Sequence, residues 1–508
     1  MVPGTHAAPL VDHVDTFGED NMLTRGQTVP DVDEAATVPV PLKPGQLSLH
    51  HPRVVHGSGP NRSDRRRVGF AIQSYITPAV EQVIGKIWVQ TARGTDFGGH
   101  HTEAPRTTAE MAPEDIAFRD MTNDELSKIF YAGAAAAGFT IDANPSHAPG
   151  PFPNRAGSLD DAVMRAAADE ITGWAGYAPT PLHDLPEIAE RLGVARVVFK
   201  DESARFGLGS FKALGGAYAV AHLAKQAEAA GGSITDVTVA TATDGNHGRS
   251  VSWGASRVGC KAKIYIHAHV SKAREEAMAA FGADVIRING NYEASLAACK
   301  EDAAAHGWQI VSDTSWPGYT EVPLTVMAGY TLMAREALDQ LGGNAPSHAF
   351  LPVGVGGLAA GLIAPLWQAA GAGLGKMISV ESHMSACMRD SLVAGAPTLV
   401  DITEETLMAG LSCGEVSTLA WEIMKPTVSH CITIGDDAVA PLMRWFHRRT
   451  PSIEAGECST SGLAACLAAH ADLAAREQLG FDQDSVILLA GTEGATDPEF
   501  YQRTIEAA

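Results

Sequence analysis

In the second part of the chain, short apolar runs alternate with longer alanine-rich stretches. The apolar runs are typical of buried strands, and the alanine-rich stretches are typical of helices. This alternation predicts an α/β fold in which helices cover parallel sheets. The expected strands are 196–199, 237–240, 262–267, 284–288, 309–312, 348–352, 377–381 and 485–490, and the expected helices are 213–230, 245–258, 272–281 and 292–306.

The first part of the chain has a different pattern. Residues 38–51 and 66–76 carry alternating or β-branched apolar residues, which predict strands. A stretch rich in Pro, Asn, Ser and Gly follows, and this composition predicts a linker or mobile arm. We therefore expect a β-rich segment at 1–138, a linker at 139–158 and an α/β domain at 159–508.

Composition narrows the functional classes. A chain of 508 residues predicts two or three domains. Its formal net charge of −22 argues against a surface for nucleic acid or anionic membrane. No apolar run approaches the ~20 residues that span a bilayer, and no signal peptide is evident. The seven cysteines lack metal-binding spacing and predict a reduced, cytoplasmic protein; whether Cys387 and Cys413 meet stays open.

One stretch, residues 200–218 (KDESARFGLGSFKALGGAY), places Lys212 in the first turn of a helix. The following residues are small or apolar. A lysine is unfavourable on such a packed helix face unless its amine has a function. Burial lowers the pKa of a lysine and frees its amine as a nucleophile. A lysine that extends along the surface is the alternative on this stretch alone.

Three further stretches join a strand to a loop: residues 241–248, 352–361 and 490–494. The first offers backbone N–H groups and short polar side chains suited to a carboxylate. The second is rich in glycine and opens a helix, which suits a phosphate. A glycine-rich turn can also serve helix–sheet packing alone. Neither GxGxxG with a following acidic residue nor GxxxxGK followed by Ser or Thr fits these stretches, which argues against nucleotide binding.

Taken together, these stretches resemble the fold type II pyridoxal-phosphate enzymes over about residues 155–508. Within that group the chain is most similar to the diaminopropionate ammonia-lyase family. The strings that carry the resemblance are YAPTPL, FKDESARFGLGSFKALGGAYA, TATDGNHGRSVSW, SDTSWPGYTEVP, MAGLSCGE and GTEGATD. Asp244 stands where related dehydratases have a serine, and this acid favours the ammonia-lyases. The resemblance implies two parallel-sheet α/β subdomains, a homodimer and pyridoxal 5′-phosphate as cofactor.

The resemblance also assigns roles. Lys212 is expected to bind the cofactor aldehyde covalently, Asn246 to bind the ring hydroxyl, and Thr492 to be a neutral partner of the ring nitrogen. The glycines expected around the phosphate are Gly354, Gly356 and Gly357.

The implied reaction removes both amino groups of a small amino acid, 2,3-diaminopropionate, to give pyruvate and two ammonia. We hypothesise that Lys212 takes the α-proton on one side and that Asp244 is the base for the other enantiomer. Asp313 is hypothesised to hold the β-ammonium, because the leaving nitrogen must stay protonated. A serine or threonine dehydratase of the same fold and a catalytically silent binding protein are the alternatives.

Simpler roles compete for several of these residues. Asp313 could be a turn or cap residue, and His247 could be a structural residue at a helix start. Glu381 follows a strand and could merely lie near the cofactor. Lys200 and Arg205 could be surface charges, although neighbouring acids favour a local ion-pair loop.

The N-terminal segment resembles the C-terminal part of the phytanoyl-CoA dioxygenase family, which has a double-stranded β-helix. LSLHHPRVVHGSGPNRSDRRRVGFAIQSYI carries the resemblance, with the iron-ligand histidine at His56 and the 2-oxoglutarate arginine at Arg67. That iron site also needs an upstream His-x-Asp/Glu pair. His13 and Asp15 have the spacing, but the family's layout places the true pair before residue 3. We expect a partial β-rich segment without metal chemistry; an iron and 2-oxoglutarate oxygenase is the alternative.

Overall fold

The computed structural model describes residues 2–5, 14–15, 27–29, 32–40, 54–56, 88–89, 102–106, 118, 121–122, 139–153, 158–243 and 245–506. The chain divides into two compact units, Met1–Thr77 and Pro78–Ala508. Among the residues just given, no helix is both long and apolar enough to cross a membrane.

In the first unit, two short strands pair antiparallel, β1 (Val14–Asp15) with β2 (Gln27–Thr28). The backbone N–H of Val2 donates to the carbonyl of Val55 at 2.8 Å. His56 is exposed, and its Nδ1 lies 2.7 Å from the carbonyl of Val54. Of the expected strand 38–51, residues 38–40 form no strand. The rest of it, the strand 66–76, His13 and Arg67 lie outside the described residues.

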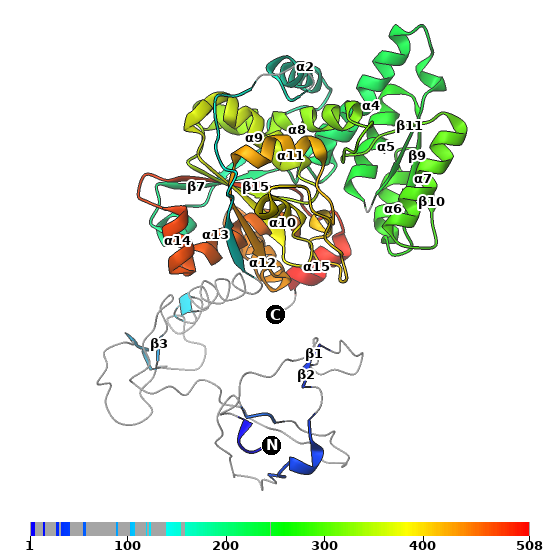
Figure 1. Cartoon of the computed structure of the whole chain (residues 1–508). Helices are drawn as coiled ribbons and strands as arrows, with labels where there is room; N and C mark the ends of the chain where they lie inside the picture. The colour runs from blue at the N-terminus through cyan, green and yellow to red at the C-terminus, as the bar shows by residue number, and fades with distance from the viewer. Residues whose placement is uncertain are drawn as a thin grey trace. The chain divides into compact units, whose positions relative to one another are not determined.

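The second unit is built on two sheets, as Figure 1 shows. The larger has the strand order β5-β14-β13-β12-β15-β7-β6, with parallel inner strands and an antiparallel strand at each edge. The central strands are buried along nearly their whole length, which explains their continuous apolar runs. The strands of this sheet are β5 (Thr140–Ala143), β6 (Leu182–Asp184), β7 (Arg196–Asp201), β12 (His348–Pro352), β13 (Lys376–Ser382), β14 (Val428–Ile434) and β15 (Val486–Gly491).

The smaller sheet is wholly parallel, in the order β10-β9-β8-β11. The predicted α/β class with two parallel-sheet subdomains is therefore confirmed. The strands of this sheet are β8 (Thr238–Ala242), β9 (Lys261–Ile266), β10 (Asp284–Arg287) and β11 (Gln309–Ile310); a separate pair is β3 (Trp88–Val89) and β4 (Thr102–Glu103).

Helices cover both sheets. Those before residue 345 are α2 (Asp161–Thr172), α3 (Pro186–Leu192), α4 (Lys212–Ala229), α5 (Asn246–Val258), α6 (Lys272–Ala279), α7 (Tyr292–His306) and α8 (Glu321–Gln340). The later ones are α9 (Gly357–Ala370), α10 (Cys387–Ala394), α11 (Thr418–Thr427), α12 (Val439–Arg448), α13 (Ser461–Ala471), α14 (Leu473–Leu479) and α15 (Pro498–Glu506).

Helix α4, which begins at Lys212, packs tightly between α5 and α8. A Cβ atom at Gly254 of α5 would lie 2.7 Å from the Cα of Ala217, and one at Gly329 of α8 would lie 2.2 Å from the carbonyl oxygen of Leu214. The glycines of α5 and α8 therefore permit close contacts with α4. These contacts hold the start of α4 in one place.

Two strands were missed at one edge of the larger sheet. Strand β14 follows α11 without a loop, and Ser429 and His430 interrupt its apolar pattern. Strand β5 lies in the expected linker but pairs antiparallel with β14. Just after β5, the Asn144 amide donates to the carbonyls of Lys425 and Val428 at 2.8 and 2.7 Å. The start of the expected linker is therefore part of the sheet, and the prediction of a mobile arm was wrong there.

Lys200 and Arg205 are buried, not surface charges. The Lys200 amine donates to Glu336 at 2.7 Å. The Arg205 guanidinium binds Glu336 at 2.8 Å and Glu202 at 2.7 Å. Buried charges are tolerated when they are paired and hydrogen-bonded. This network ties the loop before Lys212 to α8.

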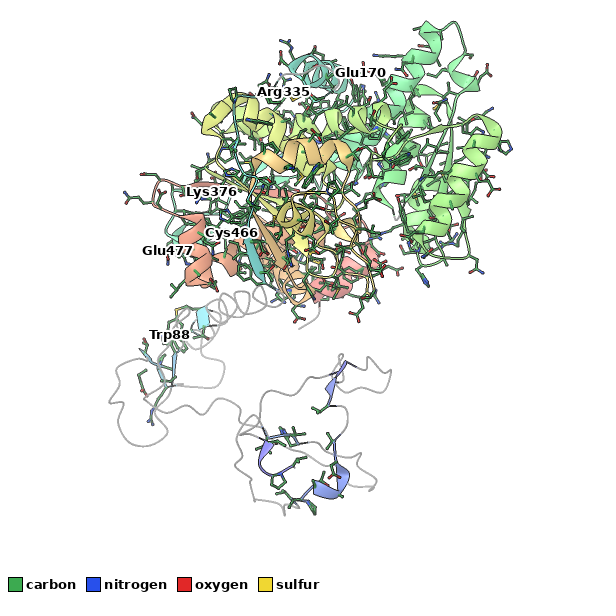
Figure 2. The ribbon with its side chains drawn as sticks, viewed as in Figure 1. Trp88, Glu170, Arg335, Lys376, Cys466 and Glu477 are labelled. Carbon is green, nitrogen blue, oxygen red and sulfur yellow. The ribbon has the colours of Figure 1, made fainter. Side chains whose placement is uncertain are left out.

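Lys376, which Figure 2 labels, binds the C-terminal end of α14. Its amine donates to the carbonyls of Gln478 and Leu479 at 2.8 and 2.7 Å. A cation is stabilised at a helix C-terminus, where carbonyl groups lack partners within the helix. The contact fastens α14 to the first residue of β13.

Candidate active site

The predicted site residues that the structure describes follow the carboxyl ends of parallel strands in both sheets. Asn246 follows β8, Asp313 follows β11, residues 354–357 follow β12, and Thr492 follows β15. Ligands of open α/β sheets bind outside the carboxyl ends of the strands. Asp244 lies outside the described residues.

The side chains of Lys212 and Asp313 form an ion pair. They are 21% and 22% exposed, so a small molecule can reach both. Burial alone would lower the pKa of Lys212, but the charge of Asp313 outweighs burial and raises it. Burial would raise the pKa of Asp313, but the charge of Lys212 lowers it. Asp313 is therefore more than a turn residue, because its carboxylate faces the candidate nucleophile.

His247 lies beside this pair, and its ring is buried. Its Nε2 lies 2.9 Å from the carbonyl of Val311, which can only accept, so Nε2 carries the proton. Its Nδ1 lies 4.0 Å from Asp313 Oδ2 and has no hydrogen-bond partner. Burial lowers the pKa of His247, which favours the neutral ring. His247 therefore lies at a helix start, as the simpler interpretation expected, and it also lies next to the carboxylate of Asp313.

Asn246, the first residue of α5, reaches the loop after β15. Its amide nitrogen donates to Glu493 Oε2 at 2.5 Å. The hydroxyl of Thr492 lies 3.3 Å from the hydroxyl of Ser459 and is buried. The carbonyl of Thr492 accepts from the N–H of Phe211 at 3.0 Å, next to Lys212. The two residues predicted to bind the cofactor ring are thus connected, one to Glu493 and the other to the start of α4.

The glycine loop at residues 354–357 leads into α9 and is closely surrounded. A Cβ at Gly354 would lie 2.7 Å from the carbonyl oxygen of Gly410, and one at Gly357 would lie 3.3 Å from the carbonyl oxygen of Asp313. The second contact places this loop beside the Lys212–Asp313 pair. The loop therefore presents backbone groups and no side chains at its glycines, as a phosphate-binding loop does.

Replacing Gly356 with alanine should weaken cofactor binding about tenfold and lower the free energy of unfolding by about 1–3 kcal/mol. Gly356 has φ +97°, and its Cβ would lie 2.8 Å from Met388 Cε. Titration of the cofactor into apoprotein and thermal melting measure the two effects. Gly371→Ala is the control, because Gly371 has φ +57° with nothing within 4 Å. Equal cofactor affinities for the two variants would contradict the expectation.

The simpler interpretation of Glu381 was that it follows a strand and lies near the cofactor without a direct role. The Glu381 carboxylate accepts from the N–H groups of Met388 and Arg389, both at 2.8 Å, at the start of α10. Burial raises the pKa of Glu381 to about 8. Its contacts are those of a helix cap.

Cys387 and Cys413 both lie near Gly354, but no disulfide joins them. Cys387 Sγ lies 3.7 Å from the carbonyl oxygen of Gly354, and a Cβ at that glycine would lie 3.0 Å from Cys413 Sγ.

The donors and acceptors of this site fit pyridoxal phosphate. A lysine amine, an amide, a neutral hydroxyl and a glycine loop at a helix start suit its aldehyde, ring oxygen, ring nitrogen and phosphate respectively. The contacts at Gly354 and Gly356 show that this loop has no room for side chains there. Glu493 is not among the residues predicted from the sequence, although the GTEG string places it next to Thr492.

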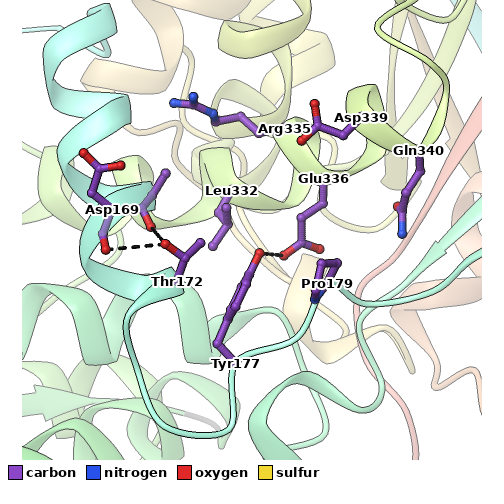
Figure 3. A pocket seen from close by; sticks show the side chains of 10 residues that line it. Asp169, Thr172, Tyr177, Pro179, Leu332, Arg335, Glu336, Asp339 and Gln340 are labelled. Atoms are coloured by element: carbon purple, nitrogen blue, oxygen red, sulfur yellow. Dashed lines mark hydrogen bonds between the residues drawn. The ribbon is translucent and has the colours of Figure 1, made fainter.

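A cavity of about 410 Å³ lies elsewhere in the second unit, between α2 and α8 (Figure 3). At its wall the Tyr177 hydroxyl donates to Glu336 at 3.1 Å, which connects the cavity to the buried ion network. None of the predicted site residues lines it. Its lining residues are Ala168, Asp169, Thr172, Tyr177, Pro179, Leu332, Arg335, Glu336, Asp339 and Gln340.

Comparison with known families matches both parts of the chain. Residues 174–491 match the pyridoxal-phosphate dependent enzyme family. Residues 1–69 match the phytanoyl-CoA dioxygenase family. Both resemblances read from the sequence are confirmed.

Individual proteins give the same result. Diaminopropionate ammonia-lyase of Escherichia coli K12 is 37% identical over 350 residues, which are 65% of this chain and 88% of that protein. The crystal structure of the E. coli diaminopropionate ammonia-lyase in complex with D-serine has a TM-score of 0.67 and 34% identity, and the match covers 72% of this chain and 97% of that one. A biosynthetic L-threonine dehydratase of Salmonella typhimurium is 29% identical, over 61% of this chain and 55% of that protein.

Proposed function

The chain belongs to the pyridoxal-phosphate dependent enzymes, in the diaminopropionate ammonia-lyase family, and on this basis we propose that it converts 2,3-diaminopropionate and water into pyruvate and two ammonia. Bound pyridoxal phosphate supplies an aldehyde that attaches amines and a ring that takes up the electrons left by the α-proton. The residues that would hold it are Lys212, Asn246, Gly354, Gly356, Gly357 and Thr492.

Lys212 acts as nucleophile and as base. In the structure its amine is held as an ammonium by Asp313. It must therefore lose a proton, for example to the amine of an incoming substrate, before it can attack an aldehyde or take the α-proton at Nζ. The hydroxyl of Ser250 donates to the carbonyl of Lys212 at 2.6 Å and keeps the start of α4 in place during this exchange.

Asp313 serves the leaving group. Neutral ammonia leaves far more readily than an amide anion, so the β-nitrogen must carry an extra proton. The low pKa of Asp313 keeps its carboxylate charged, and a charged carboxylate attracts the β-ammonium of the substrate. The contact between Lys212 and Asp313 is the observation that carries the proposal, because a hydroxyl leaving group would not require this charge.

Asp244 is proposed as the base that takes the α-proton of the enantiomer that Lys212 does not serve. Asp244→Asn should lower kcat on that enantiomer by about 100-fold or more, as loss of a general base does, and lower it much less on the other. Initial rates of pyruvate release from D- and L-diaminopropionate measure the ratio. Equal losses on both enantiomers would remove Asp244 from this role.

The proposed function is tested with purified full-length protein. We expect the absorbance of bound cofactor, followed by pyruvate and two equivalents of ammonia when D- or L-diaminopropionate is added. A serine or threonine dehydratase is the second candidate, favoured by the more distant dehydratase relative. Faster pyruvate or 2-oxobutyrate release from serine or threonine than from diaminopropionate would establish that activity instead.

The N-terminal segment 1–138 is proposed to be an inactive remnant of the dioxygenase family. The lyase domain follows it and includes β5 at the start of the expected linker 139–158, in addition to residues 159–508. The match of residues 1–69 to the dioxygenase family supports the origin of the segment. Iron-dependent turnover of 2-oxoglutarate by the full chain would show an active oxygenase and overturn this proposal.

We also propose a cytoplasmic homodimer. Seven cysteines without a disulfide among them suit a reducing compartment. Val393, Leu399 and Leu407 are 50%, 77% and 46% exposed, and a partner subunit could cover these apolar side chains. Light scattering of the purified protein distinguishes a dimer from a monomer.

A further inference from the structure

Glu493 uses both of its carboxylate oxygens in contacts with other parts of the site. Oε2 accepts from the Asn246 amide nitrogen at 2.5 Å, and Oε1 accepts from the backbone N–H of Cys458 at 3.2 Å. Asn246 begins α5, and Cys458 begins a short 3-10 helix, Cys458–Thr460, that leads into α13. The carboxylate thus bridges two helix starts.

The backbone of Glu493 is held as firmly as its side chain. Its N–H donates to the Ser459 hydroxyl at 2.7 Å, and that hydroxyl donates to its carbonyl at 2.6 Å. The same carbonyl accepts from the N–H of Gly456 at 2.9 Å. Ser459 also lies 3.3 Å from the hydroxyl of Thr492. The carboxylate is therefore fixed relative to both predicted ring partners.

This contact decides which atoms Asn246 offers to a ligand. A carboxylate only accepts hydrogen bonds, so the amide nitrogen must face Glu493 and the amide oxygen must point elsewhere. One N–H of the amide then stays available for another acceptor. Without the carboxylate the amide could rotate by 180° and present its oxygen instead.

We propose that Glu493 is a positioning residue, which orients the Asn246 amide so that its second N–H meets the ring oxygen of the cofactor. The inference rests on the proposed function, because it concerns the same cofactor. In this proposal Glu493 does not contact the cofactor. It works through Asn246, while Ser459 sets its place beside Thr492.

Glu493→Gln tests the proposal with little change in volume. Glutamine has a single acceptor oxygen, so it cannot serve both Asn246 and the Cys458 N–H. We expect apoprotein of this variant to bind pyridoxal phosphate about tenfold more weakly, with a shifted absorbance maximum of the bound cofactor. Glu454→Gln is the matched control. Glu454 accepts from the N–H of Ala495 at 2.9 Å in the same loop and has no contact with Asn246 among its described hydrogen bonds, so its variant should keep affinity and spectrum.

A double variant separates positioning from general stability. In an Asn246→Ala background, Glu493→Gln should cause little further loss of affinity; a full tenfold further loss overturns the proposal. Equal affinities of Glu493→Gln and wild type overturn it while leaving the proposed function intact, whereas a wild-type protein that binds no cofactor overturns both. If Glu493→Gln does not fold, Glu493→Asp keeps the charge but shortens the reach, and the same loss is expected.

Discussion

Replacing Lys212 with alanine is expected to abolish pyruvate release, with a loss of at least about four orders of magnitude in kcat, as when a catalytic nucleophile is removed. The amine is the only group of the site expected to bind the cofactor covalently. After borohydride reduction and denaturation, the wild-type chain should therefore retain the cofactor, and the variant should lose it. Mass spectrometry of the two chains measures this difference without relying on activity.

Lys225→Ala is the matched control for this prediction. Lys225 lies on the same helix α4, with a side chain 63% exposed and paired with Glu170. The same substitution there changes the charge equally but leaves the site untouched. Covalent cofactor retained by Lys212→Ala, or lost by Lys225→Ala, would contradict the role of Lys212.

Replacing Asp313 with asparagine is expected to lower kcat on diaminopropionate by about 100- to 1000-fold, within the range for loss of a general acid–base group. An amide carries no charge to hold the β-ammonium. With β-chloroalanine, whose chloride leaves without a proton, the loss should be much smaller. Rates of pyruvate release from the two substrates measure the ratio, and similar losses on both would exclude Asp313 from leaving-group chemistry.

The same variant also tests the ion pair directly. The charge of Asp313 raises the pKa of Lys212, so its removal should lower that pKa. A lysine with a lower pKa loses its proton at lower pH, and the apoprotein should then attach pyridoxal phosphate at lower pH than wild type does. The rise in cofactor absorbance at each pH measures this shift. Asp284→Asn, at an exposed acid paired with Lys263, serves as control.

The start of helix α4 is an element that the local sequence pattern predicts well. The helix was expected from residue 213, and it begins at Lys212. The prediction was close because the small residues, the apolar neighbours and the preceding strand all lie within the same short stretch of sequence. The glycine loop before α9 and the turn before α5 were found for the same reason. Strand β14 was missed, since Ser429 and His430 interrupt its apolar pattern, and its burial between β5 and β13 is decided only by the packed sheet.

The sequence by itself thus determined the fold class and the family and predicted the lysine of the site, because strand periodicity, helix starts and family strings are local properties. Only the tertiary structure decided which side chains meet. Asp313 lies 101 residues from Lys212, and Glu493 lies 247 residues from Asn246. The burial of Arg205 between Glu202 and Glu336 likewise depends on α8 packing against the loop before Lys212. Such contacts join residues far apart in the chain, and their geometry exists only once both sheets and their helices have packed.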